Sequence, residues 1–355
     1  MQNWKVKIVD RTLEFKFVAG TSRGSLTEHQ VNYLILEKSG VRGIGEIAPL
    51  PKLSIDYGKD FESILSTINW PKSLTSQEEV FEFVKTLNLS SYPSLAFAIE
   101  TALLDYLHGG NHKIFDCALL NKEEQIPING LVWMNSKEHM LGQVKTKIEE
   151  GFTCIKMKIG AINLDDELDI LAFIREKYPK EKLILRVDAN GAFDYNQSKE
   201  VLKKLQELGI HSIEQPMSVG HICEMRTLSK YNSVGVALDE ELIGIHTFED
   251  KQRLVEEIQP NYLILKPTLL GGLNSCLEWI EIAQKQEIDW WLTSALESNV
   301  GLNAVTQFAS YLEVENYQGL GTGKLYHNNI DSPLEINNGM IGYDPQKKWG
   351  SIEEL

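Results

Sequence analysis

The pattern of apolar and polar positions divides the chain into two parts with different periodicities. Up to about residue 50, apolar and polar residues alternate between glycine-rich turns, which is typical of half-buried antiparallel strands. Such strands are expected at residues 4–9, 13–17 and 31–37. From about residue 58 the apolar positions recur at helical spacing, which predicts helices over 61–68, 77–87 and 94–107. The first part therefore reads as an α+β domain.

From about residue 126, short β-rich segments alternate with helical patterns. Eight such segments are expected, at 127–132, 154–158, 183–188, 212–214, 235–239, 262–266, 290–294 and, with the weakest pattern, 317–321. Buried strands that alternate with helices favour a parallel sheet, and eight such units predict an α/β fold of the (β/α)8 TIM-barrel type. The segment from about 330 to 355 is rich in turn residues, and we expect it to pack against the N-terminal domain.

Five consecutive predicted strands end on an ionisable side chain. In chain order these residues are Lys158, Asp188, Glu214, Asp239 and Lys266. The carboxyl ends of the strands form the mouth of such a barrel, where the chemistry takes place. Five charges buried in succession would be too costly to keep without a common function. The pattern therefore predicts an active site at this mouth.

The chemistry of these residue types suggests their roles. Three carboxylates on adjacent strands repel one another and require a cation, and ligands that are all oxygen favour Mg²⁺. Lys158 and Lys266 would then flank the metal on opposite sides. If a substrate carboxylate binds the metal, Mg²⁺ would stabilise the enediolate that forms when the α-proton leaves.

Lys156 precedes Lys158 by two positions, so both side chains of a strand would face the same side. Two neighbouring ammonium groups disfavour each other's charge, which lowers a lysine pKa toward the range that a general base needs. Taken alone, the motif also fits an edge strand with solvated lysines.

Composition and charge narrow the class of protein. The chain has 355 residues, of which 43% are hydrophobic and 24% charged, as in globular proteins. Its net charge of −15 argues against nucleic acid or an anionic membrane as a partner. The four cysteines are scattered, and there is no apolar stretch of membrane-spanning length and no signal-peptide pattern at the N-terminus. We therefore expect a cytoplasmic enzyme acting on a small carboxylate, with no sequence signature for its oligomeric state.

The motifs together resemble those of the enolase superfamily, in its mandelate racemase-like and muconate-lactonising branch, over essentially the full length. The resemblance rests on Lys156-Met157-Lys158, Asp188-Ala189-Asn190, Glu214-Gln215-Pro216, Asp239-Glu240 and Lys266-Pro267. It implies a catalytic barrel, here residues 121–327, covered by an α+β capping domain made of residues 1–120 and the tail 328–355. It also implies that loops 20–24 and 47–55 close over the substrate.

The same resemblance implies a role for each matching residue. Asp188, Glu214 and Asp239 would bind Mg²⁺, for which Mn²⁺ could substitute. Lys158 would be the base, Lys266 the lysine across the substrate, and Lys156 the neighbour that tunes Lys158. Asn190 and Glu240 would support these groups from behind. A Lys base with Mg²⁺ is general enolase-superfamily chemistry.

Segments 294–301 and 319–325 resemble those of o-succinylbenzoate synthases. This resemblance implies syn dehydration of 2-succinyl-6-hydroxy-2,4-cyclohexadiene-1-carboxylate, a step in menaquinone synthesis, with Lys158 removing the α-proton and then protonating the departing hydroxyl. We expect the substrate to contact Arg23, Ser294, Glu297 and Gly321. For Glu297 an acid at a helix N-terminus is an equal alternative, and Arg23 also fits an ordinary exposed loop arginine.

Other activities remain as alternatives. A dipeptide epimerase would use both lysines but usually carries an Asp-x-Asp pair after the eighth strand, whereas no acidic residue lies between Glu315 and Asp331 here. That absence does not touch an N-acylamino acid racemase. A Schiff-base aldolase using Lys266 would leave the three carboxylates without a role. A non-catalytic barrel that only binds ligands would have no reason to keep them.

Overall fold

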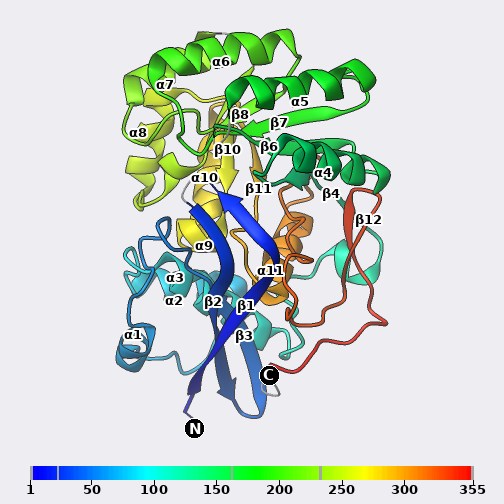
Figure 1. Cartoon of the computed structure of the whole chain (residues 1–355). Coiled ribbons are helices and arrows are strands. Elements are labelled where there is room, and N and C mark those ends of the chain that lie inside the picture. Colours follow the sequence, from blue (N-terminus) through cyan, green and yellow to red (C-terminus); the bar gives the residue numbers. More distant parts are fainter. Residues whose placement is uncertain (1–2, 22–23, 161–162, 232–233, 353–355) are drawn as a thin grey trace.

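A computed structural model describes residues 3–21, 24–160, 163–231 and 234–352 of the chain. Figure 1 shows an antiparallel sheet of N-terminal strands (blue) with small helices at its side, and a larger α/β part whose helices α5 to α8 lie at the opposite end of the molecule. The C-terminal segment (red) runs beside β4 (Ile126–Pro127), which joins the sheet of the C-terminal hairpin. The fold class is α/β, as predicted.

The N-terminal sheet has the order β1 (Lys5–Thr21), β2 (Gly24–Lys38) and β3 (Val41–Ile47), all antiparallel. The prediction of two separate strands at 4–9 and 13–17 was wrong, because β1 is continuous. The polar residues 10–12 that suggested a break stay paired with residues 30–32 of β2. The cross-strand hydrogen bonds therefore hold the strand together where its side-chain pattern changes.

Three helices follow as predicted: α1 (Phe61–Thr67), α2 (Gln77–Thr86) and α3 (Pro93–Leu107). The small residues of α3 let β3 approach it very closely. A Cβ on Gly45 would lie 2.0 Å from the carbonyl oxygen of Ala98, a distance at which any side chain would clash. Helix α3 is buried over almost its whole length, between β3 and the α/β part.

The α/β part contains a seven-stranded parallel sheet that runs from β5 to β11 in chain order. Its strands are β5 (Gly130–Val132), β6 (Cys154–Lys158), β7 (Ile184–Asp188), β8 (Ser212–Glu214), β9 (Gly235–Leu238), β10 (Tyr262–Leu265) and β11 (Asp289–Leu292). The predicted strand at 317–321 forms no strand. Instead, Gln318 and Gly319 make single parallel bridges to Ile128 and Thr293, one at each edge of the sheet, so the arrangement fits a TIM-type barrel.

Helices cover this sheet between the strands. They are α4 (Lys137–Glu149), α5 (Leu164–Lys177), α6 (Tyr195–Glu207), α7 (Ile222–Tyr231), α8 (Phe248–Ile258), α9 (Pro267–Leu270), α10 (Leu273–Lys285) and α11 (Asn299–Tyr311), with short 3-10 turns η1 (Ala118–Asn121) and η2 (Glu240–Leu242). The predicted first strand of the barrel, 127–132, is split in two. Its first half, β4 (Ile126–Pro127), pairs with the tail instead of the barrel.

The C-terminal tail contacts both parts of the molecule, whereas the sequence predicted packing against the N-terminal domain alone. Its hairpin, β12 (Leu334–Asn337) and β13 (Met340–Tyr343), pairs with β4. Beyond the hairpin, Ile352 belongs to the same apolar cluster as Leu13 and Phe15 of β1. Across the described residues, no helix is both long and apolar enough for a membrane span, and all four cysteines are free thiols.

Two buried carboxylates from the N-terminal domain cap helices of the α/β part. Glu46 of β3 accepts hydrogen bonds from the backbone N–H groups of Ser298 and Gly301, both at 2.7 Å, at the start of α11. Glu100 of α3 accepts one from Leu273 N at 2.5 Å, at the start of α10. An anion at a helix N-terminus is stabilised by the helix dipole and by the unpaired N–H groups. These contacts fix the N-terminal domain to the rest of the molecule.

Burial of such carboxylates makes stability depend on pH. Desolvation raises the pKa of Glu46 to about 7, of Glu100 to about 8 and of Asp105 to about 7. Their folded pKa values exceed the unfolded ones, so the folded state binds more protons and stability is lost as pH rises through this range. We expect the free energy of unfolding to be roughly 2–3 kcal/mol larger at pH 6.5 than at pH 8.5, measured by urea denaturation.

Below pH 6.5 the gain should level off. Burial lowers the pKa of three histidines to about 4, so they stay neutral when folded and cost stability as pH falls below their unfolded pKa. They are His29, His112 and His211. The control is Glu100→Gln, which should show a smaller difference between pH 6.5 and 8.5. An unchanged difference in that variant would contradict this assignment.

Candidate active site

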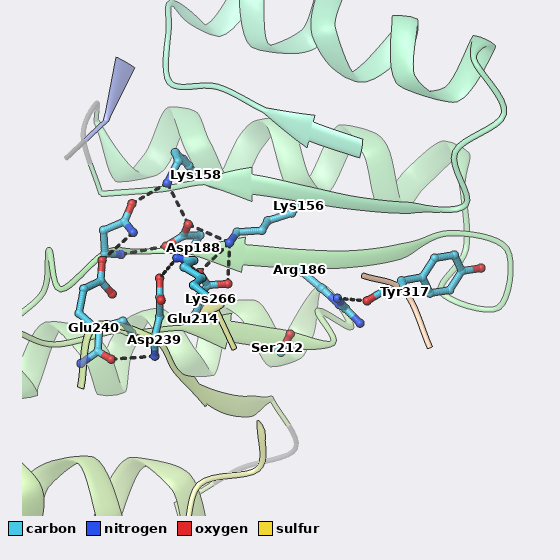
Figure 2. A network of polar contacts seen from close by, with 12 residues as sticks. Lys156, Lys158, Arg186, Asp188, Ser212, Glu214, Asp239, Glu240, Lys266 and Tyr317 are labelled. Carbon is cyan, nitrogen blue, oxygen red and sulfur yellow. Dashed lines mark hydrogen bonds and ion pairs between the residues drawn. The ribbon is translucent and has the colours of Figure 1, made fainter. Parts of the chain in front are cut away.

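Six charged side chains meet where β6 to β10 end. We call them the ionic cluster: Lys156, Lys158, Asp188, Glu214, Asp239 and Lys266. The register of the sheet places them side by side, because Lys158 pairs with Asp188 and Asp188 with Glu214. Asp239 and Lys266 directly follow β9 and β10. Figure 2 shows their charged ends turned toward one another.

Lys156 lies at the centre of the cluster. Its Nζ is 2.6 Å from Glu214 Oε2 and 3.1 Å from Asp188 Oδ2, so it joins two carboxylates of neighbouring strands. Only 6% of Lys156 and 9% of Lys158 is exposed, and β6 lies between β5 and β7. These lysines therefore do not belong to a solvated edge strand, which removes that alternative.

The two other lysines lie on either side of this centre. Lys158 Nζ donates to Asp188 Oδ2 at 2.9 Å and to Asn190 Oδ1 at 2.7 Å, and Asn190 in turn donates to Glu240 Oε1 at 3.0 Å. Lys266 Nζ forms an ion pair with Asp239 and lies 3.8 Å from Glu214 Oε1. Asn190 and Glu240 thus form a hydrogen-bonded chain next to Lys158, at positions to which the family resemblance gave supporting roles.

The cluster shifts the pKa values of its members in opposite directions. Burial opposes the charge of Lys156, but the nearby carboxylates of Asp188, Glu214 and Asp239 raise its pKa above the usual value. The expectation that its lysine neighbour lowers its pKa was therefore wrong for Lys156, because the opposite charges across the sheet outweigh the like charge. Burial also opposes ionisation of Asp188, yet the surrounding lysines hold the pKa of Asp188 below its usual range.

The end of the cluster around Asp239 has an excess of negative charge. Burial raises the pKa of Asp239 well above its ordinary value, against the opposing effect of Lys266, and the adjacent Glu240 adds to the rise. For Lys266, burial lowers the pKa, but Asp239 and Glu214 outweigh it and raise the pKa overall. An additional cation close to Asp239 would offset the charge that is hardest to keep buried there.

The three carboxylates fit a divalent metal by their donor chemistry. Asp188, Glu214 and Asp239 are buried, with at most 3% exposed, and they offer only oxygen, which a hard cation such as Mg²⁺ prefers. Within the described ranges, however, no three His, Cys, Asp or Glu side chains are grouped closely enough to form a metal site. The ammonium groups of Lys156 and Lys266 stand between the carboxylates and supply the neutralising charge.

A cavity of about 360 Å³ opens above the cluster. Lys156, Lys158, Asp188 and Lys266 line its floor, with Asn190 and Glu240 beside them. Its walls come from both parts of the molecule, since Gly24 to Leu26 and Leu50 to Leu53 of the N-terminal domain also line it. Lys158 and Lys266, which the sequence motifs place on opposite flanks of the substrate, thus line one cavity.

The expected substrate-binding residues have different locations. Ser294 and Gly321 line the cavity. Glu297 does not reach it: the side chain is fully buried and accepts hydrogen bonds from Thr268 Oγ1 at 2.5 Å and Ser294 Oγ at 2.6 Å. Glu297 thus holds the wall in place from behind, because these hydroxyl groups occupy its carboxylate. Arg23 lies outside the described residues.

Other lining residues carry no signal in the sequence. Asn129 and Thr293 line the cavity and are at least nine-tenths buried, and the described residues provide no hydrogen-bond partner for Asn129 Oδ1 or Thr293 Oγ1. Both atoms are thus buried polar groups beside the cavity that lack a partner among the described residues. In the sequence, Gln215 stands out only as part of the motif Glu214-Gln215-Pro216. In the structure its Oε1 accepts a hydrogen bond from Asp239 N at 3.2 Å and so orients Asp239.

The comparison with known families decides to which family the chain belongs. A family model described as Enolase C-terminal domain-like matches residues 139–347, more than half of the chain. The chain belongs to the enolase superfamily. It is an enzyme of that superfamily, in agreement with the resemblance of its motifs.

Individual superfamily members are similar over nearly the whole chain. An o-succinylbenzoate synthase from Desulfotalea psychrophila is 38% identical over 93% of this chain and 96% of its own length. An L-Ala-D/L-Glu epimerase from Thermotoga maritima is 27% identical over 89% of this chain and 88% of its own length.

Solved superfamily structures share this fold. The crystal structure of MenC from Desulfotalea psychrophila has a TM-score of 0.86 at 34% identity and covers 96% of this chain and all of its own. A dipeptide epimerase from Enterococcus faecalis, solved with Mg and the dipeptide L-Leu-L-Tyr, has a TM-score of 0.80 at 16% identity, with 98% of each chain covered. The latter shows the likeness of the fold alone.

Proposed function

We propose that this enzyme is a Mg²⁺-dependent lyase that dehydrates 2-succinyl-6-hydroxy-2,4-cyclohexadiene-1-carboxylate to o-succinylbenzoate in cytoplasmic menaquinone synthesis. The observation that carries the proposal is that Lys158 and Lys266 line one cavity with buried carboxylates between them. The similarity to an o-succinylbenzoate synthase at 38% identity supports the choice of substrate.

Asp188, Glu214 and Asp239 would hold Mg²⁺, which when bound stabilises negative charge on a substrate carboxylate. Neutral Lys158 takes the α-proton and becomes an ammonium group. The same ammonium group then donates a proton to the hydroxyl that leaves as water, so Lys158 returns to its neutral form. Both transfers take place on one side of the substrate, which makes the elimination syn.

The remaining residues of the site prepare these two transfers. Asn190 accepts a hydrogen bond from Lys158 and is itself held by Glu240, which fixes the direction of the Lys158 amine. Lys266 places a positive charge on the other flank of the substrate, where it opposes the build-up of negative charge. Lys156 remains paired with Glu214 and Asp188 and supplies a positive charge between these two carboxylates.

We further propose that residues 1–120 and 328–355 act as a capping domain over a barrel formed by 121–327. The contribution of Ser25, Leu26, Leu50 and Leu53 to the cavity wall supports this division. Closure of this domain would exclude water while the α-carbon carries negative charge. The unpartnered acceptors Asn129 Oδ1 and Thr293 Oγ1 would meet polar groups of the enclosed substrate.

Racemisation of N-acylamino acids is a second candidate function, since it needs an amine on each side of the α-carbon and both Lys158 and Lys266 line the cavity. A dipeptide substrate is less favoured. The segment between Glu315 and Asp331 supplies Gly319, Gly321 and Thr322 to the wall but no carboxylate that could hold a substrate ammonium group.

The test is turnover of the cyclohexadiene substrate beside N-succinylamino acids and Ala-Glu. We expect dehydration to be the fastest reaction, to stop in excess chelator and to return when Mg²⁺ is added. Each substrate is also incubated in D₂O, where proton NMR follows exchange at the α-carbon. Faster racemisation than dehydration would favour the second candidate. Activity that survives chelation would point to imine chemistry. If no substrate exchanged its α-proton, the protein would be a binding protein.

A further inference from the structure

The cavity above the ionic cluster has a larger neighbour. A second cavity of about 980 Å³ lies between α4, the end of β1 and the C-terminal hairpin. The two cavities adjoin, because the same residues line both. These shared residues are Asn129, Leu131, Trp133, Gly321 and Thr322.

Trp133 is the largest side chain of this shared wall and is held firmly. Its backbone N–H donates to Gln143 Oε1 at 2.8 Å, and Gln143 Nε2 donates to the carbonyl oxygen of Trp133 at 3.1 Å. Its ring packs edge-on against Phe17, with ring centroids 5.6 Å apart. Only 6% of the residue is exposed. These bonds anchor the backbone of Trp133, and the contact with Phe17 orients its ring as part of the wall.

The position of Trp133 matters because it stands next to Lys158. Strands β5 and β6 are paired in parallel, with Leu131 opposite Lys156 and Val132 opposite Met157. Trp133 directly follows the last residue of β5, and Lys158 is the last residue of β6, so the register brings these two positions to neighbouring strand ends. A substrate whose α-carbon is presented to the Lys158 amine thus has Trp133 close to the group that the α-carbon carries.

Apolar side chains form much of the second cavity beyond this wall. They include Phe17, Val18, Phe152, Leu325 and Ile336. A flexible apolar chain would lose its contact with water there, and each buried methylene group favours binding. The space of about 980 Å³ exceeds the 360 Å³ of the first cavity, so it offers room for a longer acyl chain.

We propose that Trp133 is a specificity-determining residue that closes the active cavity toward the second one and thereby limits the length of the acyl group on the substrate. The second cavity is the space that a longer acyl chain occupies once this wall is opened. This inference rests on the proposed function, because it assumes a substrate carboxylate whose α-carbon faces Lys158.

The test compares wild type with Trp133→Ala on N-acetyl-, N-succinyl- and N-decanoylmethionine. The α-proton exchange in D₂O is followed by NMR, and the dissociation constants are measured by calorimetry with Mg²⁺ present. In the variant we expect the ratio of N-decanoyl to N-acetyl affinity to rise at least about 10-fold, since several methylene groups become buried. Trp133→Leu, which keeps an apolar side chain, should show a smaller rise in this affinity ratio. It replaces the alanine variant in the test if Trp133→Ala does not fold.

The matched control is Val18→Ala, which enlarges the second cavity without touching the shared wall. Its affinity ratio should equal that of wild type. The inference is overturned if folded Trp133→Ala or Trp133→Leu keeps the wild-type ratio, or if Val18→Ala raises the ratio equally. The calorimetric ratio decides this even if no substrate exchanges its α-proton, an outcome that would contradict the proposed function alone.

Discussion

Replacing Lys158 by alanine is expected to reduce dehydration by roughly 10⁴-fold, the upper range for loss of a general acid–base group. The loss should be large because one amine carries out both proton transfers, and no other lysine takes its place. Lys156 is held between Glu214 and Asp188, and Lys266 lies on the other flank beside Asp239. Steady-state rates with the cyclohexadiene substrate measure the effect.

A measurement of metal binding separates the chemical role of Lys158 from a structural role. Lys158 Nζ contacts Asp188 Oδ2 but is not itself a candidate ligand, so Lys158→Ala should bind Mn²⁺ within a few-fold of wild type in a calorimetric titration. The exposed Lys177→Ala serves as the control and should retain full turnover. If Lys158→Ala kept a tenth of the wild-type rate, another group would have to be the base.

The ends of the strands were predictable from the sequence, because buried charges stand out from an apolar strand. Strands β6 and β8 have the predicted bounds, and the charges that end β6, β7 and β8 meet as expected. How these charges pair was harder to predict. The pKa of Lys156 depends on carboxylates across the sheet, at distances that only the closed fold sets.

The wall of the cavity could not be predicted in the same way. Asn129, Trp133 and Thr293 are ordinary residues of short strands or their ends, and nothing in their spacing marks them as lining a site. Glu297 shows the opposite case, since an acidic residue near the mouth suggests substrate contact. In the folded chain, hydroxyl groups of Thr268 and Ser294 enclose it completely. Such outcomes depend on which side chains meet from distant segments.

The charge balance of the cluster leads to the second large effect, in Glu214→Gln. Glu214 lies between Asp188 and Asp239 along the strand ends and is in contact with both Lys156 and Lys266. An amide keeps the shape of the side chain but removes its charge, so two buried ammonium groups lose a shared partner. We expect turnover to fall at least about 10³-fold, which corresponds to roughly 4 kcal/mol of lost stabilisation of the transition state. Affinity for Mn²⁺ should fall as well.

Glu241→Gln is the matched control for this variant. Glu241 is also a buried acid, but its carboxylate accepts from Gln215 Nε2 at 3.0 Å and from Gly220 N at 2.8 Å and not from the lysines of the cluster. Its replacement should lower the free energy of unfolding by about 1–3 kcal/mol through the lost hydrogen bonds, with wild-type Mn²⁺ affinity. If both variants lost metal affinity equally, general destabilisation would explain the result. If Glu214→Gln bound Mn²⁺ like wild type, Glu214 would not be a metal ligand, and its role would be confined to pairing with the lysines.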